Sequence, residues 1–345
     1  MVIVDATKGN DDLWDYLKTS LETMRSPARV EATIALSILR SDQSKRYHLC
    51  IRRGTLVIID AHNHPNYHGH DARKILENMD AQGIDQMWLL SWETPRDEYD
   101  VELFQRVLPP TAASGIPLED VLAVGREAPD RFVIGYAPHP KRPDAIDRFK
   151  SAVETHGVRL AGESKARIVF DDPDYLRLLH VFGEYRTPVT IHLEYDVPHG
   201  RGSYPRPDYW YGGTIEALER ALIACPNTMF IGHGPGWWSH ISGDDKFDKQ
   251  MYPEGPILPG GKNQRLLREY PNMYADLSAI SGLTALSRND TFARGYLVDF
   301  QDKLLFARDW FKSSLMDHLV KLDLPKAAFD KITHLNAQRL LTGQS

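Results

Sequence analysis

The stretch that decides the fold is LVIIDAHNHPNYHGH, residues 56–70, in which four aliphatic residues precede a dense run of histidines. Its first five residues, 56–60, have the apolar, β-branched composition of a buried strand. Residues two apart on a strand point to the same side, so His62 and His64 would face one way where this strand ends. Two neutral imidazoles that converge on one point could hold a metal, although each could equally be a hydrogen-bonded surface group.

Short apolar runs continue to alternate with longer amphipathic runs along the rest of the chain. This alternation is typical of βα units and a parallel sheet. Eight runs, the number that closes a barrel, are interpreted as strands: residues 56–60, 86–91, 131–137, 158–162, 188–193, 228–233, 272–277 and 303–309. We therefore predict an α/β protein whose residues 56–345 form a distorted (β/α)8 TIM barrel.

The first part of the chain, residues 1–55, has a different character. Residues 11–24 are amphipathic at helical spacing, whereas residues 40–54 are basic and show no clean period. We expect an N-terminal extension, mostly helical or irregular, that precedes the barrel domain.

The composition excludes several classes of function. A formal net charge of -6 disfavours a nucleic-acid or anionic-membrane surface, because both need a basic face. Only Cys50 and Cys225 occur, without CxxC spacing, so neither disulfides nor a thiolate metal site is indicated. The N-terminus lacks a basic segment before a long apolar core, and no long apolar run occurs elsewhere. We expect a cytoplasmic protein that binds a small-molecule substrate, and no nucleic acid or membrane, and forms a homo-oligomer such as a dimer.

Metal-ligand residue types also stand at the ends of other predicted strands. Glu163 ends the fourth, His192 the fifth, His233 the sixth and Asp309 the eighth. The carboxyl ends of parallel strands meet at one face of a barrel, so these side chains would converge. Each residue alone is readily structural, but the joint pattern predicts a shared catalytic centre for a divalent metal, Zn²⁺ or alternatively Mn²⁺. By contrast, His68 and His70 lie past the first strand and are expected in a solvated loop.

Four motifs carry a resemblance to a known family: DAHNH, PVTIH, IGHGPG and LLFARDW, in that order. Together they resemble the amidohydrolase superfamily, specifically its amidohydrolase-2 branch, which includes aminocarboxymuconate-semialdehyde decarboxylase-like proteins. The resemblance runs from about residue 57 to residue 343. It implies the barrel fold and the metal site, and it does not identify the substrate.

The resemblance implies a role for each matched residue. His62 and His64 resemble the metal ligands of the first strand, and His192 resembles the ligand of the fifth. Asp309 resembles the carboxylate of the eighth strand, which binds metal and can shuttle a proton. His233 resembles the histidine that stands near the metal-bound water.

One departure concerns the residues before Asp309. The family often has Gly-Ser or Gly-Thr there, whereas this chain has Ala307 and Arg308. Strand alternation would point Arg308 away from the face that carries Asp309, so the proposed ligand role survives.

Glu163 supports two interpretations. Some branches of the superfamily place a glutamate or a carboxylated lysine on the fourth strand to bridge two metals, and GESK offers Glu163 and Lys165 on one face. Alternatively, Glu163 pairs with Lys165 or Arg167 at the barrel rim. The sequence therefore leaves open whether one metal or two are bound and whether Glu163 is a ligand.

The expected activity is that of a metal-dependent hydrolase, with His233 and Asp309 as catalytic residues and a metal-activated water. Non-oxidative decarboxylation of a small carboxylic acid is the alternative reaction. A barrel that binds metal or ligand without catalysis is a third interpretation, which the additional acid-base group at His233 argues against. Residues 194–213 combine arginines with aromatic residues, which suits either a planar or carboxylated ligand or simple packing.

Overall fold

The computed structural model describes residues 32–39, 46–53, 57–95, 98, 101–109, 112, 115–196 and 210–343 of the chain. The chain divides into two compact units, residues 1–57 and residues 58–345. Among the described residues, no helix has the length and apolar character needed to cross a membrane.

The first unit contains a β-hairpin. Strand β1 (Ala32–Leu39) pairs antiparallel with β2 (Arg46–Arg53). Both strands differ from the mostly helical or irregular extension that the sequence predicts, and β2 replaces the irregular structure expected within residues 40–54. Hydrophobic residues recur at every second position in Tyr47, Leu49 and Ile51 of β2, a period typical of strands, and the basic residues around them obscure it. The helix expected over residues 11–24 lies outside the described part of the chain.

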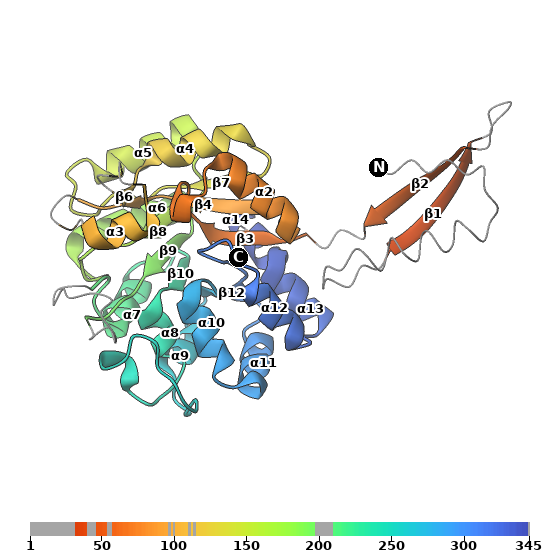
Figure 1. The fold of residues 1–345 in the computed structure, drawn as a ribbon. Coiled ribbons are helices and arrows are strands. Elements are labelled where there is room, and N and C mark those ends of the chain that lie inside the picture. The colour runs from red at the N-terminus through yellow and green to blue at the C-terminus, as the bar shows by residue number, and fades with distance from the viewer. Residues whose placement is uncertain are drawn as a thin grey trace. The chain divides into compact units, whose positions relative to one another are not determined.

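The second unit is a barrel of parallel strands (Figure 1). Its strands are β3 (Ile59–Asn63), β4 (Gln86–Leu90), β7 (Phe132–Gly135), β8 (Ala161–Ser164), β9 (Val189–His192), β10 (Phe230–His233), β11 (Met273–Asp276) and β12 (Leu304–Leu305). They pair in the orders β3-β4-β7 and β8-β9-β10-β11-β12. A parallel bridge between Gly135 and Leu160 joins the two groups on one side. On the other side, Ala61 N donates to Phe306 O at 3.0 Å, so the predicted barrel is confirmed.

The first barrel strand is displaced from its predicted position. It spans Ile59–Asn63 rather than residues 56–60, because its pairing with β4 continues past a register irregularity. As a result His62 lies inside the strand and His64 just beyond its end. Both histidines therefore keep the position at the carboxyl end of the strand that the sequence indicates.

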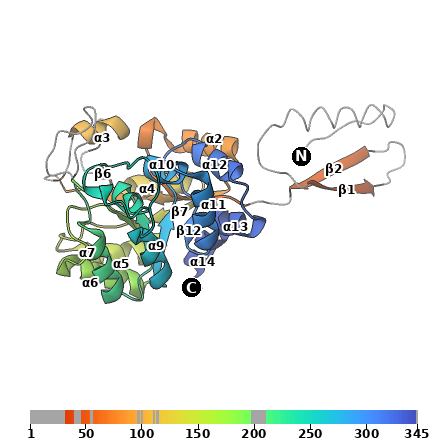
Figure 2. The same ribbon diagram turned by 90° about the horizontal axis from the view of Figure 1, so that it is seen from below.

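Helices lie on the outside of the barrel strands, as two perpendicular views show (Figures 1 and 2). Between strands β3 and β11 the longer ones are α2 (Ala72–Gln82), α4 (Leu118–Glu127), α5 (Ala145–His156), α6 (Pro173–Glu184), α7 (Ile215–Ala224) and α9 (Lys262–Glu269). After β11 come α10 (Ala279–Ser287), α11 (Asp290–Asp299), α12 (Ser314–Lys321), α13 (Lys326–Asp330), a π-helical turn (Lys331–Leu335) and α14 (Asn336–Thr342). Shorter elements on the loops are α3 (Val101–Val107), α8 (Pro235–Ser239), two 3₁₀ turns (Tyr67–Gly69 and Lys246–Asp248) and the antiparallel pair β5 (Trp92–Glu93) and β6 (Gly115–Ile116).

Local sequence signals account for the helix ends. Asp71 caps α2 by accepting a hydrogen bond from Lys74 N, and Gly83 ends it with a left-handed φ of 67°. Helix α6 begins at an Asp172 cap followed by Pro173. These residues therefore account for both ends of α2 and for the start of α6.

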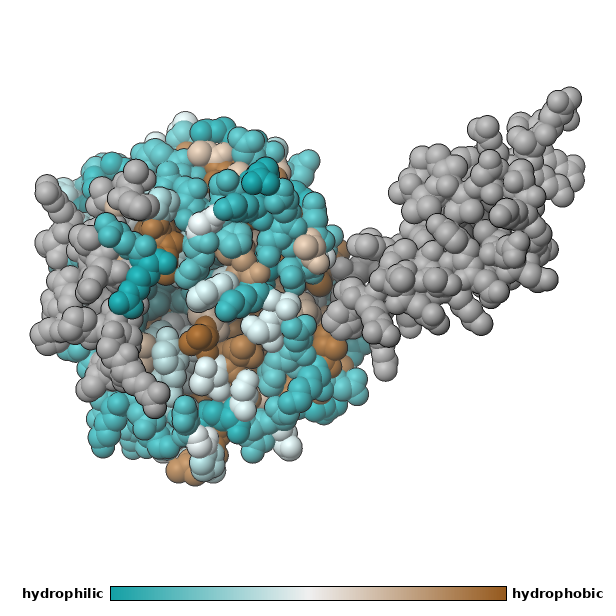
Figure 3. Space-filling model, viewed as in Figure 1, coloured by the Kyte–Doolittle hydropathy of each residue, from teal (hydrophilic) through white to brown (hydrophobic). Residues whose placement is uncertain are grey.

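Strands β8 to β11 are buried at every position, as expected for parallel strands covered on both faces. Three of them, β9, β10 and β11, end on the buried titratable residues His192, His233 and Asp276. Hydrophilic side chains dominate the face of this unit seen in Figure 3, and hydrophobic ones gather near its centre. The fold therefore concentrates its buried polar groups where neighbouring strands end.

Candidate metal centre

The histidines of the first strand have both of their Nδ1 atoms occupied. His62 Nδ1 lies 2.8 Å from Asp276 Oδ2, and His64 Nδ1 lies 2.8 Å from the carbonyl oxygen of Leu90. A carbonyl and an ionised carboxylate can only accept, so each Nδ1 donates its proton. In the neutral rings the lone pair is then on Nε2. Partners of this kind fix the tautomer of metal-binding histidines.

The two Nε2 atoms face each other at a distance of 3.2 Å. Two lone pairs cannot form a hydrogen bond with one another, so a cation between them would relieve the repulsion. Two nitrogens at this distance, each ~2.1 Å from one metal ion, subtend an angle of about 100°, close to that of tetrahedral coordination. The pair therefore fits a divalent metal.

Asp309 supplies a third atom to this group. Its Oδ1 lies 3.5 Å from His64 Nε2 and 3.9 Å from His62 Nε2. This oxygen is buried and has no hydrogen-bond partner among the described residues, which is costly unless a metal or another group binds it. The backbone of Asp309 is left-handed, with φ of 47°, and its N–H donates to His62 O at 2.9 Å. His62, His64 and Asp309 together form a group that could hold a metal ion.

Glu163 lies between this group and two further histidines. Its Oε2 is 3.3 Å from His64 Nε2, while its Oε1 is 2.6 Å from His192 Nδ1 and 3.6 Å from His233 Nε2. Burial would raise the pKa of Glu163, but its close histidine partners, His192 first among them, outweigh burial and hold the pKa well below its usual value. Glu163 is thus an ionised carboxylate that connects both groups.

His192 has carboxylates at both ring nitrogens. Besides the contact with Glu163, its Nε2 lies 2.8 Å from Glu194 Oε2. It belongs to a second group that could hold a metal, with Glu163 and His233, and reaches the first group through Glu163. The sequence interpretation missed Glu194, although a residue two positions after a strand-end histidine is the expected place for a side chain on the same side.

His233 and His62 share one carboxylate. Asp276 Oδ1 lies 3.1 Å from His233 Nδ1, and Asp276 Oδ2 contacts His62. The Ser278 hydroxyl lies 2.9 Å from His233 Nδ1 and donates to Asp276 Oδ1 at 2.6 Å. Burial lowers the pKa of His233, but the charge and hydrogen bond of Asp276 outweigh it and raise the pKa to about 9. Asp276 is fully buried and contacts both rings at their Nδ1 atoms, so it fixes the orientation of the two rings.

His68 and His70 lie outside these groups, and they are packed rather than solvated. The His68 ring stacks on Trp310 with centroids 3.9 Å apart, and the His70 ring stacks on Phe311 at 3.8 Å. The expectation of a solvated loop is therefore corrected: the loop after β3 packs on the loop after β12.

With the barrel and this cluster established, the chain can be compared with known proteins. The family model described as Amidohydrolase, of the amidohydrolase-2 type, matches residues 59–342. The chain belongs to the amidohydrolase family. That family is metal-dependent, and its members are enzymes that include hydrolases and decarboxylases. No curated protein sequence matches the chain significantly.

Solved structures share the fold of this amidohydrolase. An uncharacterised TIM-barrel protein from Bordetella bronchiseptica is 17% identical with a TM-score of 0.55, covering 83% of this chain and 98% of that one. A 2,6-dihydroxybenzoate decarboxylase from Rhizobium is 18% identical with a TM-score of 0.52, covering 84% and 99%. A dihydroxybenzoic acid decarboxylase from Polaromonas, solved with manganese and 2-nitroresorcinol, is 16% identical with a TM-score of 0.50, covering 83% and 97%. At these identities the likeness shows the common barrel.

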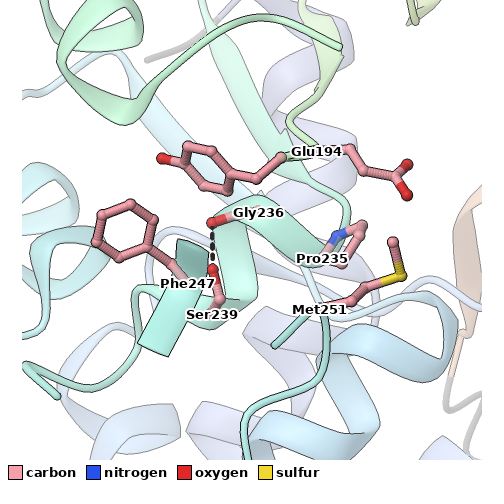
Figure 4. A pocket seen from close by; sticks show the side chains of 7 residues that line it. Glu194, Pro235, Gly236, Ser239, Phe247 and Met251 are labelled. Carbon is pink, nitrogen blue, oxygen red and sulfur yellow. Dashed lines mark hydrogen bonds between the residues drawn. The ribbon is translucent and has the colours of Figure 1, made fainter. Parts of the chain in front are cut away.

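A narrow pocket adjoins the cluster of this amidohydrolase (Figure 4). Its lining residues are Glu194, Tyr195, Pro235, Gly236, Ser239, Phe247 and Met251. In Figure 4 Met251 lies on the same side of the pocket as the Glu194 carboxylate, which contacts His192, and Phe247 lies on the opposite side. Residues 197–209, which include most of the arginine-rich and aromatic loop singled out in the sequence, lie outside the described residues.

Proposed function

We propose that this amidohydrolase is a hydrolase of a small organic molecule that depends on a divalent cation, Zn²⁺ or Mn²⁺. The observation that carries the proposal is the 3.2 Å approach of the His62 and His64 Nε2 atoms beside the unpartnered Asp309 Oδ1. Imidazole and carboxylate ligands suit both cations. Glu163 Oε2, 3.3 Å from His64 Nε2, supports Glu163 as a further ligand. The role of His192 as a ligand stays a prediction.

When bound, such a cation lowers the pKa of a coordinated water to about 7 and polarises a substrate carbonyl. Asp309 has the position of a proton carrier, because its side chain is 14% exposed whereas those of His62 and His233 are at most 1% exposed. We assign to it the transfer of a proton from water to the leaving group.

His233 has the position of a group that stabilises negative charge. Asp276 and Ser278 hold its Nδ1, so Nε2 points toward Glu163 and Asp309 at 3.6 and 3.8 Å. A proton on Nε2 would face the atoms that react. This position supports a contribution of His233 to turnover rather than to metal binding.

Non-oxidative decarboxylation of a small carboxylic acid is the second candidate. It is favoured by the ammonium group of Lys165, which forms no hydrogen bond with a described residue and whose charge acts on Glu163. An ammonium group suits a carboxylate. Two of the proteins with the same barrel are named as decarboxylases of dihydroxybenzoates. The two reactions differ in their products, which separates them experimentally.

Metal content of the protein purified without chelators tests the proposal. We expect at least one Zn or Mn per chain, lost in His62→Ala and in Asp309→Ala. His68→Ala is the matched control, because this nearby histidine lies outside the candidate ligand groups. A wild-type protein without a divalent metal, or full retention in both cluster variants, would overturn the proposal.

The reaction itself is tested with metal-loaded protein on two panels of compounds. Release of acid and alcohol or amine from esters, lactones or amides would support hydrolysis. Carbon dioxide release from small aromatic acids would support the second candidate. Ligand-dependent stabilisation without product in either panel would point to a barrel that only binds.

A further inference from the structure

A second pocket lies between helices α8 and α10, which pack against each other, and the loop of residues 242–258. The side chains that line it include Trp238 and Ser239 of α8, Met251 and Tyr252 of the loop, and Ser281 and Arg288 on or next to α10. None of the histidines or carboxylates of the candidate metal centre is among its described lining residues. The proposed function therefore leaves this pocket unexplained.

Two side chains of the pocket have buried polar atoms without a hydrogen-bond partner among the described residues, Trp238 Nε1 and Ser281 Oγ. Trp238 is 1% exposed and Ser281 is 3% exposed. A Cβ atom on Gly282 would lie 3.3 Å from Trp238 Nε1, so the indole nitrogen lies beside the helical turn that carries Ser281. An indole N–H can only donate, and a buried donor is unfavourable unless an acceptor satisfies it. The pair therefore indicates an acceptor that the described residues do not supply.

The charges around the pocket favour a negatively charged acceptor. The Arg288 side chain is 3% exposed, and its Nη2 lies 2.9 Å from Asp244 Oδ2. Lys246 Nζ lies 3.9 Å from the same carboxylate, so two cations face one anion. No acidic side chain is among the described residues that line the pocket. The positive charge that remains would attract an anion to the two unpartnered donors.

The size of the pocket restricts this anion to a small one. The free space is that of about one water molecule. Met251, Pro253 and Ala285 form the apolar part of the wall. Phosphate is bulkier and is held by several strong donors, whereas a halide ion is only slightly larger than water and accepts from any direction. The lining therefore suits a halide such as chloride.

The loop over the pocket is closed at its base and attached to the end of α10. Gly243 N donates to Leu258 O at 3.1 Å, so the two ends of the loop lie together as in an Ω-loop. Arg288 donates to two backbone carbonyls of the loop, each at 2.8 Å. Met251, within the loop, also lines the narrow pocket beside the metal centre (Figure 4). A ligand that fixes the loop to α8 and α10 would thus also fix one wall of that neighbouring pocket.

We propose that the pocket between α8 and α10 binds a monovalent anion of halide size, such as chloride. Trp238 Nε1 and Ser281 Oγ donate to the anion, and Arg288 is the neighbouring positive charge. The bound anion joins α8 to α10 and holds the loop of residues 242–258 against both helices.

Bromide, which substitutes for chloride and scatters X-rays anomalously, locates the site. Crystals of the full-length, metal-loaded protein are soaked in sodium bromide, and an anomalous difference map is calculated. We expect a peak within hydrogen-bonding distance of Trp238 Nε1 and Ser281 Oγ. The peak should lose most of its height in Trp238→Phe and in Ser281→Ala, because each variant removes one donor. Ser287→Ala, at an exposed position of the same helix, is the matched control and should keep the peak.

Proteolysis in solution tests the effect of the anion on the loop, in which Lys249 is an exposed trypsin site. We expect cleavage after Lys249 to be about threefold or more slower in sodium chloride than in sodium gluconate of equal ionic strength. A threefold effect corresponds to chloride at about twice its Kd. The difference should vanish in Trp238→Phe and persist in Ser287→Ala. An unstructured peptide substrate corrects for the effect of the salts on trypsin itself.

Several outcomes would overturn the inference. The site is excluded if the wild-type protein shows no bromide in this pocket, shows bromide only at the metal centre, or keeps an equal peak in both donor variants. Equal cleavage of the wild type in the two salts would exclude the effect on the loop. Metal content and thermal unfolding are measured on every sample, and a wild-type protein without metal would contradict the proposed function rather than the anion site.

Discussion

Arg308 and Asp60 form a buried ion pair that joins the last barrel strand to the first, with Arg308 Nε 2.8 Å from Asp60 Oδ2. The backbone N–H of Arg308 donates to Asp60 Oδ1 at 2.9 Å, and its Nη1 donates to Asn78 Oδ1 at 2.8 Å. Arg308, which departs from the family pattern before Asp309, is therefore held by Asp60 and Asn78 where the barrel closes.

We predict that Arg308→Met lowers the free energy of unfolding by about 3–5 kcal/mol, because it leaves the buried Asp60 carboxylate without its cation. Urea denaturation of the chelator-treated protein measures the effect. Arg148→Met, which breaks an exposed pair with Asp144, is the control and should cost less than about 1 kcal/mol. Equal losses of unfolding free energy in both variants would show that the Arg308–Asp60 pair does not stabilise the barrel.

Asp276→Asn should weaken metal binding without removing any candidate ligand of the first group. The carboxylate holds His62 by Nδ1, and an amide can present a donor there and turn the ring. Loss of such a partner typically costs about 10–100-fold in metal affinity. Competition with a chromophoric chelator measures it. Asp290→Asn, at a surface helix start, is the control, and an unchanged affinity in Asp276→Asn would contradict the orienting role.

The sequence predicted the barrel well because its signal is repetitive: each apolar run is followed by an amphipathic one with recognisable caps, such as Asp71 and Gly83 around α2. The predicted ends of the strands were less accurate, because a strand ends where its backbone stops pairing with the neighbouring strand. The hairpin strand β2 was missed because arginines around its alternating residues obscure the period of two.

The sequence predicted most residues of the candidate site but few of the contacts between them. His62 and His64 are close in sequence, but the Asp276 that orients His62 is 214 residues away, so no local pattern reveals the pair. His192 stands where predicted, yet its ring nitrogens face Glu163 and Glu194, which depends on side-chain placement across two strands. The expected dimer and the number of metals stay predictions.

Substitutions of Glu163 and His192 distinguish two ligand sets. Glu163 Oε2 approaches the first group directly, whereas His192 reaches it only through Glu163. We therefore expect Glu163→Gln to lower metal affinity about tenfold more than His192→Gln does, as measured by chelator competition. If His192→Gln instead loses metal as completely as His62→Ala, His192 is a direct ligand, as the family resemblance implies.

His240, just after α8, makes stability depend on pH. Its ring is buried, and its Nε2 lies 2.7 Å from the Tyr195 hydroxyl oxygen, which also accepts a hydrogen bond from Ile215 N at 3.1 Å. Burial, aided by the charge of Lys262, lowers the pKa of His240 from 6.5 to about 3.

Between pH 6.5 and pH 3 the unfolded chain carries a proton on His240 that the folded chain lacks. The free energy of unfolding is thus unaffected by this group above pH 6.5 and falls below it, by up to about 1.4 kcal/mol per pH unit. His240→Gln keeps an acceptor for Tyr195 but cannot titrate, so its stability should fall less steeply with decreasing pH than that of the wild type. Chemical denaturation at a series of pH values from about 7 to about 4.5 measures both slopes. His180→Gln, on an exposed position of α6, should keep the wild-type slope, and an equal slope in His240→Gln would exclude His240 as the source.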